Sequence, residues 1–156
     1  MPFVRYLFIF GVMVCSDAVA DPLQAAAAWM AEAHPFDTAP IEEQFGVKVK
    51  KRCAGRVSAY ECVAAGDTVE LRWRADTDGG EPREGYLRLA LDGCITRRRA
   101  EEALATSLRF DANSVADRST MPTLSARYWT PGRLWRVGMA FDGDCARRLT
   151  IATPAF

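Results

Sequence analysis

The sequence predicts a single α+β domain: an N-terminal helix, an antiparallel sheet of about five to seven strands and one inserted helix. Three observations carry this prediction. Apolar residues recur at helical spacing early in the chain, they alternate with polar residues in later stretches, and turn-forming segments separate those stretches. Four cysteines beyond the first helix add the expectation of two disulfides.

The first twenty residues have the three parts of a secretory signal peptide. Arg5 supplies the basic start, residues 6–15 the apolar core, and Ala18-Val19-Ala20 the cleavage motif. The apolar run is about half of the roughly 20 residues that a membrane-spanning helix needs. We therefore expect a cleaved signal peptide over 1–20, one exported domain over 21–156, and no stable membrane anchor.

The first predicted helix has Asp21 as its N-cap and Pro22 at its first position, and Pro35 stops it after an alanine-rich run. A helical turn over 41–45 is expected to end at Gly46. The expected apolar stripe of the first helix is Leu23, Ala26, Ala27, Met30 and Ala33.

Period-two alternation indicates the strands. It covers 69–73, 87–91, 124–129 and 135–141, and residues 149–152 are expected to add a short final strand. The turn-rich loop 76–83 predicts an antiparallel hairpin between the first two of these.

The inserted helix is predicted from about Thr96 to about Leu108. The lysine-rich stretch Lys48 to Arg52 is typical of a guarded edge strand. The residues of the inserted helix expected to face inward are Ala100, Ala103, Leu104, Ser107 and Leu108.

The cysteines of the expected mature chain are Cys53, Cys62, Cys94 and Cys145. Cys53 and Cys62 flank a turn-forming stretch, whereas Cys94 and Cys145 each follow an Asp-Gly at the end of an apolar strand. We therefore predict the pairs 53 with 62 and 94 with 145. The spacing does not fit a zinc site, so no metal is expected.

Charge and composition limit the partners. The chain carries 20 Lys and Arg against 20 Asp and Glu, so bulk electrostatics do not favour nucleic acid or an anionic membrane. An arginine- and alanine-rich composition, together with the export signal and paired cysteines, favours the periplasm of a Gram-negative bacterium.

The sequence offers little for catalysis. Its one histidine, His34, stands at a helix end, where it can cap carbonyl groups, and the common nucleophile, phosphate-loop and dinucleotide motifs are missing. Glu42, Glu43, Asp142 and Asp144 are expected to be solvated, although paired carboxylates have no sequence signature. We expect no enzyme, no catalytic residues and no cofactor.

The polar positions of the predicted strands suggest a binding surface. If the apolar positions face the core, arginines and aromatic residues share the opposite face, a composition typical of protein interfaces. A plain solvated sheet face is the alternative. The candidate partner-binding residues are Arg72, Arg74, Tyr86, Arg88, Arg127, Trp129 and Arg136.

A second candidate is the start of the inserted helix. Arg97, Arg98 and Arg99 place positive charge where the helix dipole disfavours it. Glu101 and Glu102 can balance them along the helix, and a bound anion is the alternative.

We expect a small periplasmic protein-binding module, most concretely an inhibitor or immunity protein against an envelope-acting enzyme. A small-ligand carrier or a carboxylate-dependent envelope enzyme is the alternative. A concave apolar pocket favours the alternative, and a flat aromatic patch favours protein binding. The sequence does not predict an oligomeric state.

The signal-peptide assignment predicts the first residue of the exported protein. Intact-mass measurement of periplasmic material is expected to give a chain that begins at Asp21 and carries no lipid. A full-length or lipid-modified species would contradict the assignment.

Overall fold

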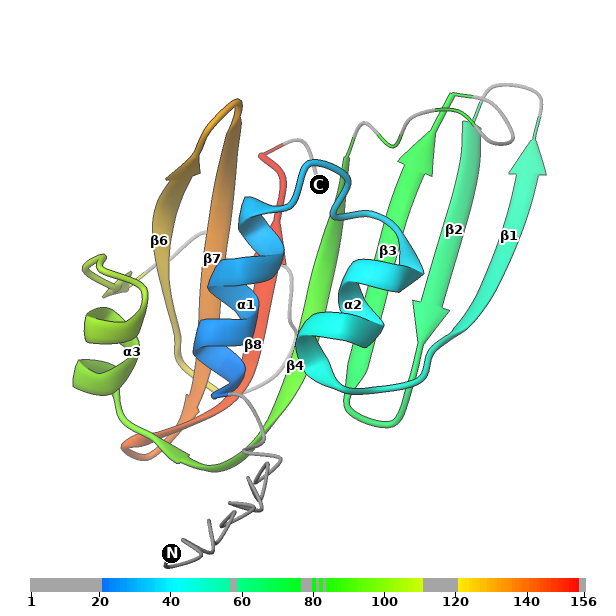
Figure 1. The fold of residues 1–156 in the computed structure, drawn as a ribbon. Helices are drawn as coiled ribbons and strands as arrows, with labels where there is room; N and C mark the ends of the chain where they lie inside the picture. The colour runs from blue at the N-terminus through cyan, green and yellow to red at the C-terminus, as the bar shows by residue number, and fades with distance from the viewer. Residues whose placement is uncertain are drawn as a thin grey trace, which may run out of the picture.

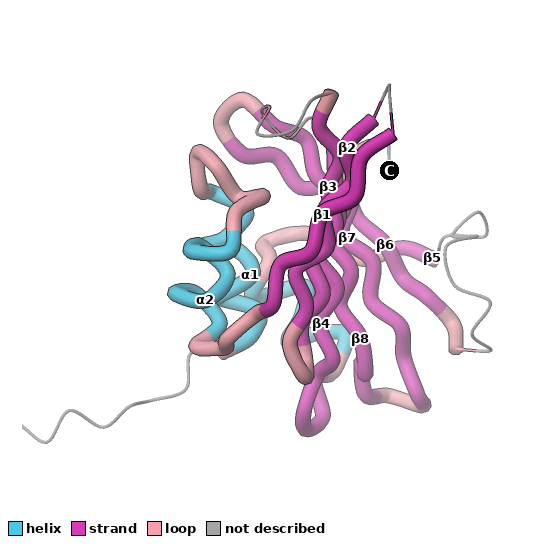
Figure 2. Tube along the Cα trace, turned by 90° about the vertical axis from the view of Figure 1, so that its right-hand side faces the viewer, coloured by secondary structure: helices cyan, strands magenta, loops and turns pink. Residues whose placement is uncertain are grey.

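The computed structural model describes residues 21–56, 59–76, 80, 82, 84–110 and 121–154. The α+β class is confirmed: eight antiparallel strands form one sheet, seven of them long and one, β5, of two residues. The helices α1 and α2 cover one face of this sheet (Figures 1 and 2). The expected signal peptide, 1–20, lies outside the described residues.

Two consecutive meanders build the sheet, in the order β1-β2-β3-β4-β8-β7-β6-β5. The first meander is β1 (Lys50–Arg56), β2 (Ala59–Ala65), β3 (Val69–Ala75) and β4 (Glu84–Ile95). The second is β5 (Arg109–Phe110), β6 (Thr123–Thr130), β7 (Arg133–Asp142) and β8 (Cys145–Ala152). Pairing of β4 with β8 joins them, and β1 is an edge strand, as the lysines predict.

The helix α1 (Pro22–Ala31) starts as predicted, because the Asp21 carboxylate accepts a hydrogen bond of 2.9 Å from the Leu23 amide. Its buried side differs from the prediction. Ala33 is exposed beyond the end of the helix, whereas Trp29 is fully buried. The Glu32 amide caps the helix by donating to the Trp29 carbonyl.

The second helix, α2 (Thr38–Phe45), is longer than the predicted turn because Asp37 caps its start. It ends at Gly46, whose left-handed backbone (φ 62°) confirms the expected stop.

The helix α3 (Arg97–Ala103) is shorter than predicted. Ala105 turns the chain with a positive φ of 46°, so Ser107 is exposed rather than buried. The Glu101 carboxylate then accepts from the Leu108 amide at 2.9 Å, and Leu108 is buried. The predicted helix was too long, because the chain turns back at Ala105 and places Leu108 in the core without a further helical turn.

The core lies between the helices and the sheet. Alternate residues of the central strands point into it, as the alternation predicts. The largest fully buried side chains include Trp29, Trp135, Met30, Leu71, Leu87, Met139, Leu149 and Ile151.

Both predicted disulfides are confirmed. Cys53 and Cys62 lie opposite each other on β1 and β2, and Cys94 and Cys145 join the ends of β4 and β8. The loops that they close span 9 and 51 residues. A chain-entropy account gives about 2.5 and about 4 kcal/mol of stabilisation respectively.

Gly85 lets the segment between α1 and α2 approach the sheet. A Cβ added at Gly85 would lie 2.6 Å from the Phe36 ring and 2.5 Å from the Arg72 carbonyl oxygen. A Cβ added at Gly138, in a similar extended strand, would meet nothing closer than 3.7 Å.

We therefore expect Gly85→Ala to lower the free energy of unfolding by about 1 to 3 kcal/mol, through overpacking. The matched control Gly138→Ala is expected to stay within about 1 kcal/mol of the native protein. Chemical unfolding curves measure both. Equal effects of the two substitutions would show that the Phe36 contact does not constrain this strand.

Candidate functional site

The sheet face opposite α1 and α2 is the candidate binding surface, here called the open face. Strand register brings its predicted residues together: Arg72 lies opposite Tyr86, Tyr86 opposite Ala152, Ala152 opposite Arg136, and Arg136 opposite Arg127. Arg74, Arg88 and Trp129 stand two residues along β3, β4 and β6, and therefore point to the same side. All seven predicted residues thus share one face.

On β2 to β4, carboxylates balance part of the positive charge. Arg72 pairs with Glu61 at 3.3 Å, and Arg74 pairs with Glu84 at 3.4 Å. These side chains are partly exposed, so each pair contributes little to stability. Their effect is to hold the two guanidinium groups in place on the open face.

Tyr86 organises the centre of this half. Its hydroxyl donates to the Glu70 carboxylate at 2.5 Å, and the guanidinium groups of Arg72 and Arg88 lie over its ring at 5.9 and 5.2 Å. Burial raises the pKa of the Tyr86 phenol above its ordinary value of 10.0, and the Glu70 carboxylate raises it further, while both arginines oppose these effects. Tyr86 therefore stays neutral at physiological pH and positions three charged neighbours.

The Arg88 guanidinium has a hydrogen-bond donor without an acceptor among the described residues. It makes no ion pair with any described carboxylate, and its Nε is buried without a hydrogen-bond partner among the described residues. The Nε of Arg72 is in the same state. Two guanidinium groups beside Tyr86 thus hold unused donors in a partly buried setting, which is costly without an acceptor.

On β6 and β7, two arginine side chains lie next to each other on the open face. Arg127 and Arg136 stand directly opposite each other across the two strands, an arrangement that destabilises a sheet. Neither makes an ion pair with a carboxylate in the described part of the chain. Two residues from Arg127, Trp129 is 72% exposed, and it is the one large hydrophobic side chain that the described structure exposes.

Between these two halves of the open face runs a strip of small side chains. Ala152 and Thr150 of β8 lie there beside Gly138 of β7.

The second predicted site, at the start of α3, is occupied by internal partners. Arg97 pairs with Glu101 at 3.0 Å, Arg98 with Glu102 at 3.6 Å, and Arg99 with Asp21 at 2.6 Å. Glu101 and Glu102 balance charge as the first alternative expected, and Asp21 is a partner that sequence spacing does not reveal. The structure places no unpaired arginine at this helix start.

The expected solvated carboxylates have structural neighbours. Glu42 accepts from the Val49 amide and pairs with Lys48, both at 3.0 Å, and these contacts lower its pKa. Asp142 pairs with Arg147 at 3.7 Å. His34 is exposed, and the described structure gives it no carbonyl to cap.

Over the described ranges, no group of three or more His, Cys, Asp or Glu side chains is arranged to hold a metal ion. No helix within these ranges is both long and apolar enough to span a bilayer. The two disulfides are consistent with an exported protein.

Comparison of this chain with protein-family models, with characterised proteins and with solved structures finds no significant match.

The raised pKa of Tyr86 predicts a pH dependence of stability. The neutral phenol and its hydrogen bond contribute fully below pH 10, the ordinary value, and this contribution is lost as the pH rises through the higher pKa of the folded state. We expect the stability advantage of the native protein over Tyr86→Phe to be constant from about pH 7 to about pH 9 and to shrink above about pH 10.

Unfolding free energies measured across that range test this expectation. An ultraviolet difference titration between the two proteins reports the ionisation of Tyr86 itself. Ionisation at or below the ordinary value would contradict the described contacts with Glu70.

Proposed function

We propose that this chain is a periplasmic protein-binding module whose open face binds an acidic surface of another protein. The observation that carries the proposal is the pair of arginines, Arg127 and Arg136, that face each other across β6 and β7. Neither makes an ion pair with a carboxylate of the described residues, and the exposed Trp129 lies beside them. A partner carboxylate placed between the two guanidinium groups would relieve their repulsion and gain charge-assisted hydrogen bonds.

The composition of the face supports a protein as the partner. Arginine, tryptophan and tyrosine are enriched at the energetic centres of protein interfaces. Tyr86 and the flanking Arg72 and Arg88 are already ordered by stacking and hydrogen bonds, so binding would cost little side-chain entropy. Overall charge neutrality gives no support for nucleic acid as the partner.

The architecture supports a rigid recognition element. Among the described residues, α1 and α2 lie on one face of the sheet, and two disulfides tie adjacent strands together. We propose an inhibitor or immunity protein against an envelope-acting enzyme as the concrete form, because such a protein needs a stable surface and no catalytic groups of its own. The proposal includes export through a cleaved signal peptide and no enzymatic activity.

The test is a charge reversal with a matched control. The double variant Arg127→Glu/Arg136→Glu is expected to fold with a nearly native thermal midpoint, because both side chains are exposed. It is expected to lose the partner that the native protein captures from envelope extract. The control Arg98→Glu/Arg147→Glu changes the net charge equally, at exposed arginines outside the open face, and is expected to capture the partner normally.

The captured protein is then identified by mass spectrometry, purified and titrated against this chain. Binding is expected to weaken as salt rises from about 0.05 to about 0.5 M, since screening shortens the range of charge attraction. Nuclease treatment of the extract is expected to leave capture unchanged. Normal capture by the Arg127/Arg136 variant would refute the proposed face, and nuclease-sensitive capture would indicate nucleic acid instead.

A further inference from the structure

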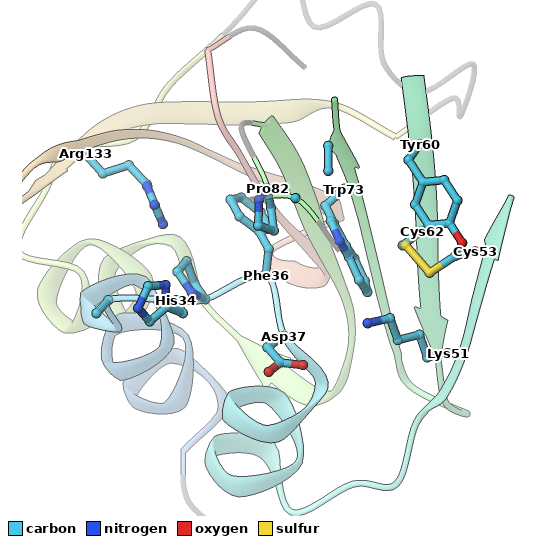
Figure 3. A pocket seen from close by; sticks show the side chains of 14 residues that line it. His34, Phe36, Asp37, Lys51, Cys53, Tyr60, Cys62, Trp73, Pro82 and Arg133 are labelled. Atoms are coloured by element: carbon cyan, nitrogen blue, oxygen red, sulfur yellow. A yellow bond between two sulfur atoms is a disulfide. The ribbon is translucent and has the colours of Figure 1, made fainter. Parts of the chain in front are cut away.

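A hollow of about 620 Å³ lies on the other side of the sheet, at the end of β1 to β3 next to the segment between α1 and α2 (Figure 3). Its volume is in the range of small-molecule sites. It shares no residue with the open face described above. Its lining includes Phe36, Tyr60, Trp73, Lys51, Arg133 and the Cys53–Cys62 disulfide.

Aromatic side chains and a disulfide form the apolar part of the wall of this hollow. Phe36 is buried against Gly85, Trp73 is buried on β3, and the disulfide and the half-buried Tyr60 extend the same surface along β1 and β2. Phe36 is also held edge-on by Trp29, with ring centres 6.1 Å apart. Such rigid rings fit the face of an aromatic or similarly flat body.

Two permanent cations border these walls without carboxylate partners in the described structure. The Arg133 guanidinium lies 5.4 Å from the centre of the Phe36 ring and 5.2 Å from that of Trp135. The Lys51 ammonium lies 5.2 Å from the centre of the Trp73 ring. Burial lowers the pKa of the Arg133 guanidinium, because its surroundings disfavour the charged form.

The one described carboxylate in the lining, Asp37, is already engaged. It caps α2 by accepting a hydrogen bond of 2.7 Å from the Thr38 amide. His34 also lines the hollow and adds a ring N–H donor. The charge of the lining therefore favours a negative group.

We infer that this hollow binds a small organic anion with a flat apolar body, such as an aryl carboxylate. Its ring would lie against Phe36 and Trp73, and its carboxylate would be held by both Arg133 and Lys51. This site is independent of the proposed protein-binding face, so either can fail without the other.

Matched probes test the inference. We expect 2-naphthoate to bind the native protein more tightly than the neutral 2-naphthylmethanol by at least about tenfold, as measured by calorimetry or by amide chemical shifts. Perturbed signals are expected at Trp73, Phe36 and Lys51. Equal affinity for the two probes, or no detectable binding of 2-naphthoate, would overturn the proposal.

Two pairs of variants locate the anion. Arg133→Gln is expected to weaken 2-naphthoate binding by about tenfold and to change 2-naphthylmethanol binding by less than about threefold. Its control is Arg147→Gln, an exposed arginine of β8 outside the hollow. Lys51→Gln is expected to weaken 2-naphthoate selectively too, whereas Lys50→Gln, which is exposed on the opposite side of β1, is expected to leave it unchanged.

The lysine pair keeps the test decisive if Arg133→Gln does not fold, because Lys51 is exposed. Equal losses in Lys51→Gln and Lys50→Gln, or an unchanged 2-naphthoate affinity in both Arg133→Gln and Lys51→Gln, would refute this site. Normal 2-naphthoate binding by Arg127→Glu/Arg136→Glu is expected and would separate this result from that for the open face.

Discussion

The structure depends on the contact of three buried rings, Trp29, Phe36 and Trp135, between α1 and the sheet. Trp29 and Trp135 lie 5.2 Å apart, and Phe36 lies 5.8 Å from Trp135. Both indole groups also donate hydrogen bonds: Trp29 to the Pro35 carbonyl at 2.8 Å and Trp135 to the Met30 carbonyl at 3.2 Å. The cluster therefore satisfies backbone acceptors at the end of α1 and fixes the segment that leads to α2. The hollow beside Phe36 exists because this segment is held there.

The two faces of the sheet use arginine in different ways. On the open face, only part of the arginine charge is paired with carboxylates, those of Glu61 and Glu84. On the helix side, the Arg133 guanidinium lies over the rings of Phe36 and Trp135. Both arrangements keep a permanent cation near the surface at some cost, and in both an external anion would lower that cost.

Much of the fold could be predicted because its signals are local. Alternation predicted β3, β4, β6 and β7 with their buried faces, although β2 and β5 were not predicted. Asp-Pro and Gly46 predicted helix ends, and the turn residues before Cys94 and Cys145 indicated their pairing. The same alternation predicted which residues share the open face. The short α3 could not be predicted, because Leu108 keeps its place in the core through a backbone return rather than a further helical turn.

The hollow and the ring cluster were beyond sequence reasoning for a different reason. Trp29, Phe36 and Trp135 come from distant parts of the chain, and no spacing rule brings them together. The Arg99 to Asp21 ion pair is of the same kind, with its residues far apart in sequence. Arg133 was missed because a single arginine after a turn carries no pattern.

The sheet order also has a consequence for the rate of folding. Every neighbouring pair of strands except β4 and β8 is consecutive in the chain, so each meander can form from local hairpins. Only the β4–β8 register requires closure of a long loop, and the Cys94–Cys145 link spans the same interval of 51 residues. An oxidised chain that unfolds keeps these two strands tethered, so it searches far fewer arrangements when it refolds. The disulfide thus lowers the entropic cost of the long-range strand pairing each time the chain refolds.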